Sequence, residues 1–188
     1  FREPVQLQCF KDELVPRLLQ RNERRHSLSL WSAGCSTGEE PYTLSMLLSE
    51  VPAFTGWDLD VLGTDLSRKA LSTARRAEYG PMALRATTPE QQARFFEKLD
   101  GGRVRLQQAF RDPVSFGQLN LLDAAAVALL PRFDVIFCRN VLIYFDQDTK
   151  INIFNRLCKV MEPDGFLVLG AAETVVGLTD AFRPFPDK

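Results

Sequence analysis

The chain has 188 residues, of which 45% are hydrophobic and 25% are charged. This balance is typical of one globular domain and excludes a disordered tail, a collagen-like fibre and a low-complexity linker. Its 23 basic and 24 acidic residues give a formal net charge of -1. A nucleic-acid binder usually carries a strongly basic surface, so we expect no nucleic acid partner.

Cysteine and histidine are sparse and scattered. Cys9, Cys35, Cys138 and Cys158 form no Cys-x-x-Cys pair, and His26, which we expect at the surface, is the only histidine. The usual zinc spacing is therefore missing, and we expect no metal site and free thiols in a cytoplasmic protein. No run of 18 apolar residues and no signal-peptide pattern occurs, so we expect no membrane insertion. A start without Met leads us to expect an excised piece of a longer chain.

The first third of the chain predicts a helix and then a strand, loop and helix. Apolar residues from Leu7 to Leu19 recur at helical spacing, with Pro16 as a weak point. The predicted strand Leu28–Ala33 enters the glycine-bearing turn Gly34–Gly38, and Glu39, Glu40 and Pro41 then open a helix that runs to Leu48.

The same alternation returns twice. Leu59–Asp65 predicts a strand that ends in an acid, and Ser67 is placed to cap a helix over Arg68–Ala77. A later strand, helix, turn and strand are predicted over Phe133–Cys138, Gln147–Met161, Glu162–Gly165 and Phe166–Leu169. Apolar strands separated by amphipathic helices predict an α/β fold whose parallel sheet is covered on both faces.

The segment from Tyr79 to about Phe116 departs from this rhythm. It contains a short helix near Pro89–Lys98, a turn at Asp100–Gly102, and alternating residues at Val104–Leu106 and Pro113–Phe116. This pattern predicts a small antiparallel lobe, residues 79–116, inserted in the α/β fold.

Three loops should converge at the carboxyl ends of the strands, where open α/β sheets bind ligands. They are Ala33–Glu39, the loop at Asp65, and Arg139–Asp146. Glycines let the backbone approach a ligand, and an acid at a strand end can accept hydrogen bonds from ribose hydroxyls, which indicates a nucleoside site. The alternative is that Gly34 and Gly38 only shape a turn and that Asp65 only caps a helix.

Two common nucleotide sites do not fit. A dinucleotide fingerprint needs G-x-G-x-x-G, and a P-loop needs G-x-x-x-x-G-K-[ST], and neither occurs. Glu39 and Glu40 at the helix start would repel a phosphate. The same acids favour a ligand with an amino group, such as the methionine part of S-adenosylmethionine.

Four motifs, in this order, resemble the CheR family. They are WSAGCSTGEEPY (Trp31–Tyr42), GTD (Gly63–Asp65), NLL (Asn120–Leu122) and FDVIFCRNVLIYFD (Phe133–Asp146). The resemblance runs nearly end to end. It implies a Rossmann-like S-adenosylmethionine-dependent methyltransferase fold with a small inserted antiparallel β-subdomain. It also implies transfer of methyl groups to glutamate side chains in the cytoplasmic helical domain of chemoreceptors, with S-adenosylhomocysteine as product.

The resemblance assigns roles position by position. Arg2 and Tyr144 resemble active-site residues near the transferring methyl group, and Arg2 also contacts the methyl donor. The remaining implied cofactor contacts are Ala33, Gly34 and Glu39 at the first loop, Asp65 at the ribose, Asn120 and Leu121 at the adenine, and Asn140 and Val141 at the crevice floor.

Several of these residues have a plainer interpretation. Arg2 could be a surface charge at a chain end, Tyr144 a packed aromatic, Asn120 a turn residue and Asn140 a cap after its strand. Cys35 and Cys138 lie near the predicted crevice, but buried free cysteines behave as small hydrophobic residues, so we assign them no catalysis.

The family pattern also implies parts that this chain lacks. We expect residues 1–188 to form the catalytic domain, with an N-terminal helical domain and a final C-terminal strand missing. A methyltransferase of another substrate and a non-catalytic S-adenosylmethionine-binding signalling module remain alternatives, and the oligomeric state stays open.

Overall fold

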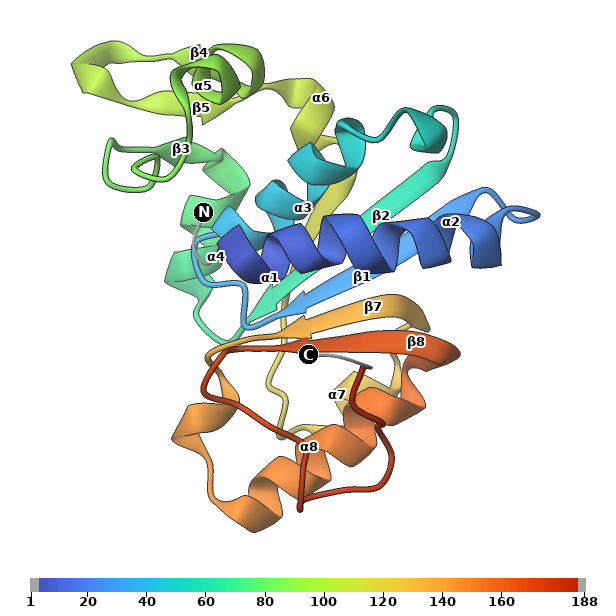
Figure 1. The fold of residues 1–188 in the computed structure, drawn as a ribbon. Helices are drawn as coiled ribbons and strands as arrows, with labels where there is room; N and C mark the ends of the chain where they lie inside the picture. Colours follow the sequence, from blue (N-terminus) through green and yellow to red (C-terminus); the bar gives the residue numbers. More distant parts are fainter. Residues whose placement is uncertain (1–3, 186–188) are drawn as a thin grey trace.

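A computed structural model describes residues 4–185, and its main feature is a five-stranded sheet (Figure 1). The strand order is β6-β2-β1-β7-β8, and all pairs are parallel. The strands are β1 (Ser27–Ala33), β2 (Asp58–Asp65), β6 (Val114–Gln118), β7 (Phe133–Cys138) and β8 (Met161–Leu169). The chain winds outward from β1 in one direction and then from β7 in the other, so the strand order switches between β1 and β7. The predicted parallel α/β fold is confirmed.

Helices cover both faces of this sheet, as Figure 1 shows for α1 and α2 on one side and α7 and α8 on the other. The helical segments around the main sheet are α1 (Pro4–Cys9), η1 (Phe10–Leu14), α2 (Val15–Asn22), α3 (Glu39–Ser49), η2 (Pro52–Phe54), α4 (Arg68–Arg76), α7 (Ala124–Ala128), η4 (Leu142–Tyr144) and α8 (Gln147–Lys159). No helix in the described range 4–185 is long and apolar enough to cross a membrane.

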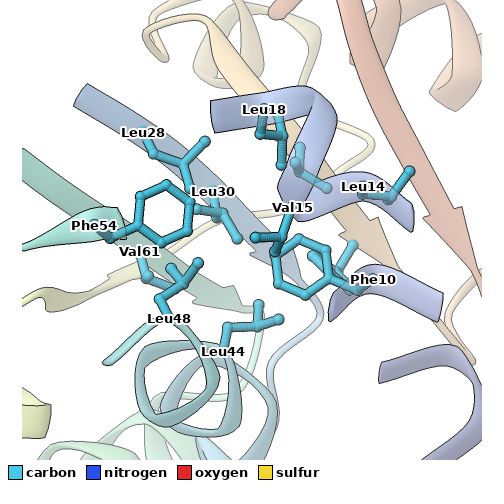
Figure 2. Packing of buried hydrophobic residues seen from close by; sticks show 12 residues of the cluster. Phe10, Leu14, Val15, Leu18, Leu28, Leu30, Leu44, Leu48, Phe54 and Val61 are labelled. Carbon is cyan, nitrogen blue, oxygen red and sulfur yellow. The ribbon is translucent and has the colours of Figure 1, made fainter. Parts of the chain in front are cut away.

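Side chains of β1 alternate between two hydrophobic cores. Leu28 and Leu30 pack with α2, η1 and α3 (Figure 2), whereas Trp31 and Ala33 pack with α7 and α8. Successive strand residues point to opposite faces, and both faces of β1 are largely buried, so only the small polar residue serine interrupts its apolar residues. The sheet therefore holds its loops on a rigid base.

The leading helix is interrupted where the sequence predicted a weak point. Phe10–Leu14 forms a π-helical turn, and Pro16 lies in the first turn of α2 that follows. Proline has no N–H for the helical ladder, so the turn before it widens instead of breaking. The apolar face stays continuous, because Phe10, Leu14 and Leu18 are all buried in one core.

A small antiparallel sheet of order β3-β5-β4 stands apart from the main sheet, at the upper left of Figure 1. Its segments are β3 (Glu78–Tyr79), α5 (Pro89–Phe95), β4 (Phe96–Lys98), η3 (Asp100–Gly102), β5 (Val104–Leu106) and α6 (Gln108–Arg111). The predicted antiparallel lobe is confirmed. The predicted helix over Pro89–Lys98 is three residues too long, because its last residues pair with β5 as a strand.

The predicted place of Pro113–Phe116 in this lobe is wrong. Val114–Gln118 forms β6, which pairs in parallel with β2 as an edge strand of the main sheet. An edge strand is less buried than a central one, so it alternates in polarity much as a strand of a small lobe does. The pattern alone could not separate the two locations.

The predicted turn at Glu162–Gly165 is also wrong in detail. These residues form a wide irregularity inside β8, since Phe133 pairs with Met161 whereas Val135 already pairs with Phe166. Gly165 is tightly packed here, because a Cβ on it would lie 2.5 Å from Met161 Cγ. Pro163 and Gly165, which indicate a turn in sequence, mark a bulge in the structure.

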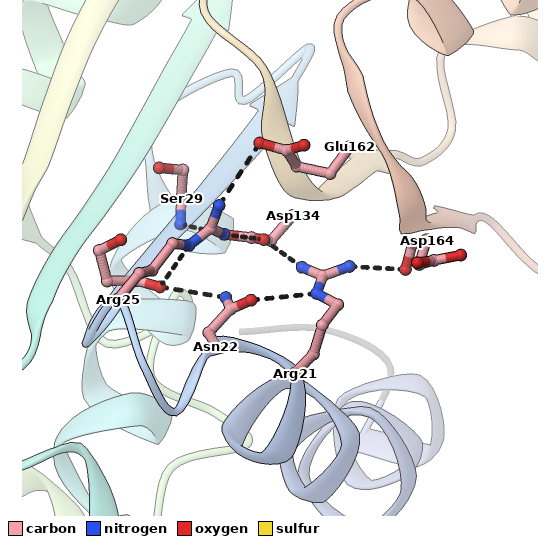
Figure 3. Close-up of polar contacts among 8 residues, drawn as sticks. Arg21, Asn22, Arg25, Ser29, Asp134, Glu162 and Asp164 are labelled. Atoms are coloured by element: carbon pink, nitrogen blue, oxygen red, sulfur yellow. Dashed lines mark hydrogen bonds and ion pairs between the residues drawn. The ribbon is translucent and has the colours of Figure 1, made fainter.

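A buried aspartate, Asp134, joins neighbouring elements at the amino-terminal ends of the strands (Figure 3). The side chain of Asp134 is 1% exposed, and it forms ion pairs with Arg21 and Arg25. It also accepts a hydrogen bond from the Ser29 N–H at 2.8 Å. Arg25 lies 3.4 Å from Glu162 in the β8 irregularity. This cluster joins α2, β1, β7 and β8 at the end opposite the predicted site.

Candidate functional site

The first loop after β1 meets the loop after β7 at the switch in strand order. The N–H groups of Gly34 and Cys35 both donate to the Thr64 carbonyl oxygen at 2.8 Å, which fixes the loop to β2. Gly34 has a φ of 85°, and a Cβ on it would lie 2.3 Å from Val141 Cγ2. Only glycine fits this place, and two predicted cofactor residues, Gly34 and Val141, are thereby in contact.

Asp65 joins the first loop to the second. Its Oδ2 accepts the Ser36 N–H and its Oδ1 accepts the Ser67 N–H, each at 2.8 Å. Ser67 caps α4 by accepting from the Ala70 N–H at 3.2 Å, as the sequence predicted. The carboxylate is half-buried, and each of its oxygens keeps one further lone pair for a ligand hydroxyl.

Three carboxylates surround the buried thiol of Cys35. Burial, and after it the negative charges of Asp65, Glu40 and Glu39, together raise the pKa of Cys35 to about 12. Glu40 is compensated by Arg139 at 2.6 Å, whereas Glu39 and Asp65 form no ion pair with another described residue. Among residues 4–185, this part of the site therefore carries negative charge that no basic side chain pairs with, which favours a cationic ligand over a phosphate.

A polar network lies beside these acids. Arg139, whose side chain is 7% exposed, donates to Glu40 Oε2 and to Gln6 Oε1, both at 2.6 Å. Ser32 Oγ donates to the other oxygen of Glu40 at 2.8 Å, and Gln6 donates to the Leu169 carbonyl oxygen at 2.9 Å. The network ties α1 to three strand ends. Arg139 and Glu40 are 99 residues apart in the sequence, so no local pattern predicts their contact.

The other predicted contacts of the first loop are placed as follows. The side chain of Ala33 is buried in the core, so a contact with a ligand can come only from its main chain. Glu39 is half-buried in the first turn of α3, where its Oε2 accepts from Thr37 Oγ1 at 2.6 Å. The Thr37 carbonyl oxygen in turn accepts from the Tyr79 hydroxyl at 3.0 Å, so the small lobe also holds this loop.

The loop after β6 lies next to Asp65, since the Leu119 N–H donates to the Asp65 carbonyl oxygen at 3.1 Å. Asn120 is exposed, and its Oδ1 accepts the Leu122 N–H at 3.0 Å, which is the turn geometry of the plainer interpretation. The Leu121 carbonyl oxygen accepts from Arg156 at 2.8 Å. The predicted adenine contacts of Asn120 and Leu121 stay predictions.

The loop after β7 is held by Glu173, a residue that no sequence motif indicated. Asn140, at a φ of 57°, and Val141 donate their N–H groups to the carboxylate of Glu173 at 2.8 and 3.0 Å. Tyr144 follows in η4 with its side chain 80% exposed. It is not a packed aromatic, so that plainer interpretation is wrong. Arg2 lies outside the described residues 4–185.

The cysteines near the site are poor nucleophiles. Cys138, like Cys35, is buried, and burial with the nearby charge of Glu173 raises its pKa well above the ordinary value. A thiol that stays protonated reacts slowly, in agreement with our assigning them no catalysis. Within residues 4–185, no group of three or more His, Cys, Asp or Glu side chains could hold a metal ion. His26 is exposed, as expected.

These features define a class: a Rossmann-like α/β domain with a nucleoside site at the switch in strand order. The comparisons specify it further. The family model described as CheR methyltransferase, SAM binding domain, matches residues 1–188. Chemotaxis protein methyltransferase 1 of Pseudomonas aeruginosa is 38% identical over 97% of this chain and 68% of its own length. Chemotaxis protein methyltransferase Cher2 of Pseudomonas putida is 36% identical over 97% of this chain and 67% of its own length.

The chain belongs to the CheR methyltransferase family. It spans about two thirds of the length of these two relatives. A crystal structure of WbdD, only 16% identical, superposes with a TM-score of 0.51 over 89% of this chain and 29% of that one, which shows a shared fold. S-adenosylmethionine is the ligand of this domain, and methyl transfer is its chemistry. The negative charge and the glycine contact described above suit this cationic nucleoside.

Proposed function

We propose that this protein transfers methyl groups from S-adenosylmethionine to glutamate side chains in the cytoplasmic helical domain of chemoreceptors. The observation that carries the proposal is the joining of Gly34, Asp65 and Val141 around the switch in strand order, within a chain of the CheR family. The relatives are named chemotaxis protein methyltransferases, which supports a receptor as substrate. The scattered free thiols support a cytoplasmic location.

The ribose and the positive charge of the donor would each have a distinct partner. We assign the ribose hydroxyls to Asp65, because its two oxygens keep free lone pairs after they accept two backbone N–H groups. We assign the cationic end to the field of Glu39 and Asp65, which no described basic side chain neutralises. Gly34 and Val141 would form the wall between them.

Bound S-adenosylmethionine supplies a methyl group on a positively charged sulfur. A glutamate carboxylate, with an ordinary pKa of about 4.3, is already ionised at neutral pH, so the protein needs no general base. This agrees with a site without a histidine. The protein promotes the reaction by excluding water and by aligning the carboxylate oxygen with the methyl carbon and the sulfur.

Tyr144 is the side chain that we propose to meet the incoming carboxylate. It stands exposed on the loop after β7, and its hydroxyl can donate a hydrogen bond to a carboxylate. We propose Arg2 as a second group that steers the carboxylate, on the basis of the family resemblance.

The test is a transfer assay with the full-length protein, receptor cytoplasmic domains and donor labelled in its methyl group. We expect label on the receptor that is lost in mild base, as a methyl ester requires. Label that resists base, or that appears only on metabolites, would favour another methyltransferase substrate. Donor binding without any transfer would favour a non-catalytic signalling module.

Tyr144→Phe separates the two roles of this residue. We expect the variant to bind the donor as well as the wild type does but to transfer methyl groups more slowly, because only the hydroxyl is lost. An equal loss in both measurements would make Tyr144 a binding residue only.

A further inference from the structure

We propose that Glu173 is a positioning residue that sets the affinity for the methyl donor, an inference that rests on the proposed site. Its carboxylate collects four backbone N–H groups from two loops. Oε1 accepts from Val141 at 3.0 Å and from Leu142 at 2.7 Å. Oε2 accepts from Asn140 and from Gly170, each at 2.8 Å.

These four bonds use the full capacity of the carboxylate. Each carboxylate oxygen has two lone pairs, and all four are occupied. Glu173 therefore has no acceptor left for a ligand and no free position from which to take a proton. Its effect on the reaction has to pass through the backbone that it holds.

The backbone that Glu173 holds is arranged to receive an anion. Asn140 has a φ of 57°, a left-handed conformation that asparagine adopts more readily than most residues with a side chain. Three consecutive N–H groups, at residues 140–142, point at one acceptor, as in the backbone nests that bind anions. A neutral replacement of Glu173 would leave these N–H dipoles converging without charge to stabilise them.

The same backbone forms one wall of the proposed donor site. Val141 is the residue that comes against Gly34, and Tyr144 follows three positions later in η4. A shift of this loop by a few tenths of an ångström would change both the wall and the rim of the site. The contact between Gly34 and Val141 therefore depends on a carboxylate 32 residues further along the chain.

Gly170 makes room for this arrangement at the end of β8. A Cβ on Gly170 would lie 2.8 Å from Glu173 Oε2 and 3.0 Å from the Asn140 nitrogen. Any larger residue would push the carboxylate off the loop. The segment Gly170–Glu173 is thus built as one unit with the loop after β7.

The first test compares Glu173→Gln with the wild type in calorimetry with S-adenosylhomocysteine. Glutamine keeps the shape but turns an NH2 group toward two backbone donors, so those hydrogen bonds are lost. We expect the Kd to rise about 10- to 100-fold, as for the loss of hydrogen bonds to a charged group. The matched control is Glu162→Gln, which removes a glutamate of β8 that pairs with Arg25 at the opposite edge. Its Kd should stay within twofold of the wild type.

Chemical rescue separates positioning from general destabilisation. Glu173→Ala leaves a small space lined by the four N–H groups, and formate is an anion that fits it. We expect millimolar formate to restore at least part of the affinity in this variant and to have no effect on the wild type. Should Glu173→Ala not fold, Gly170→Ala replaces it, with the same 10- to 100-fold expectation for the Kd and without the formate arm.

The outcomes distinguish the two levels of the proposal. A wild-type protein that does not bind S-adenosylhomocysteine would overturn the proposed site itself. A wild type that binds, together with a Glu173→Gln variant whose Kd is within twofold of it, would overturn the role of Glu173 alone. An equal loss of affinity in Glu162→Gln would also overturn it, because both variants would then act through stability.

Discussion

Replacing Asp65 by alanine should weaken donor binding more than it weakens the fold. The variant loses two hydrogen bonds to the Ser36 and Ser67 N–H groups, each 2.8 Å long. Both serines are exposed, so water can replace the lost acceptor, and we expect a stability loss of about 1 to 2 kcal/mol. The ribose hydroxyls lose a charged acceptor, which costs about 1.5 to 3 kcal/mol, or roughly 10- to 150-fold in Kd.

Two measurements separate these effects. Calorimetry with S-adenosylhomocysteine gives the Kd, and urea unfolding without ligand gives the free energy of unfolding. Asp134→Ala is the control, because Asp134 also accepts a backbone N–H but lies at the amino-terminal edge of the sheet. We expect this control to lose more stability than Asp65→Ala and to keep the wild-type Kd.

One result would refute the reasoning about Asp65. A folded Asp65→Ala protein whose Kd is within twofold of the wild type would mean that this carboxylate only joins two loops. A Kd that rises equally in Asp134→Ala would mean that affinity follows stability in general.

Four further predictions concern packing, thiol reactivity, the pH dependence of stability and the buried ion pairs. Gly34→Ala should lower the free energy of unfolding by about 2 to 4 kcal/mol and raise the Kd at least tenfold. Gly101 also has a positive φ but has open space around it, so Gly101→Ala should lower the free energy of unfolding by only about 1 to 2 kcal/mol and leave the Kd unchanged. Equal effects would contradict the packing argument. At pH 8 the exposed Cys158 should react with iodoacetamide at least a hundredfold faster than the buried Cys35, as measured by peptide mass spectrometry. Modification of Cys35 before Cys158 would contradict the burial of Cys35. The pKa of Cys35 is raised from 9.0 to about 12, so the thiol stabilises the fold fully below pH 9 and loses this contribution as the pH rises toward 12. The free energy of unfolding should therefore fall over this pH range, and it should fall less steeply in Cys35→Ala. Asp134→Ala should lower the free energy of unfolding, measured with urea, by about 3 kcal/mol. This is the low end for a broken buried ion pair, because the arginine partners are partly exposed. A loss below about 1 kcal/mol would contradict the stabilising role of this cluster.

The sequence predicted the parts of the fold that depend on local patterns. Apolar runs such as Phe133–Cys138 identified the buried central strands, because a strand covered on both faces has few polar positions. Gly34 and Asp65 could be placed at one edge because the carboxyl ends of parallel strands meet there. These patterns are short and need no knowledge of distant contacts.

The errors arose where the meaning of a pattern depends on its neighbour. Val114–Gln118 alternates in polarity, but only its pairing with β2 shows that it extends the main sheet. Pro163 and Gly165 indicate a turn, and only the pairing of β7 with both sides of them shows a bulge. Periodicity along a chain carries no information on which strand lies alongside.

Glu173 shows the same limit at the site. In sequence it is an acid that follows Gly170 by three positions, a common surface pattern. Its importance comes from N–H groups that a left-handed turn at Asn140 directs toward it. The sequence signal that could have pointed to it is Gly170, since a glycine at a strand often marks a close approach of another backbone.

The most direct measurement of the central claim is a crystal structure of the protein with S-adenosylhomocysteine bound. We expect the ribose hydroxyls to lie within hydrogen-bond distance of Asp65 and the sulfur to face the loop that carries Val141 and Tyr144. Density for the ligand at any other place on the protein, with only solvent beside Gly34, Asp65 and Val141, would contradict the account.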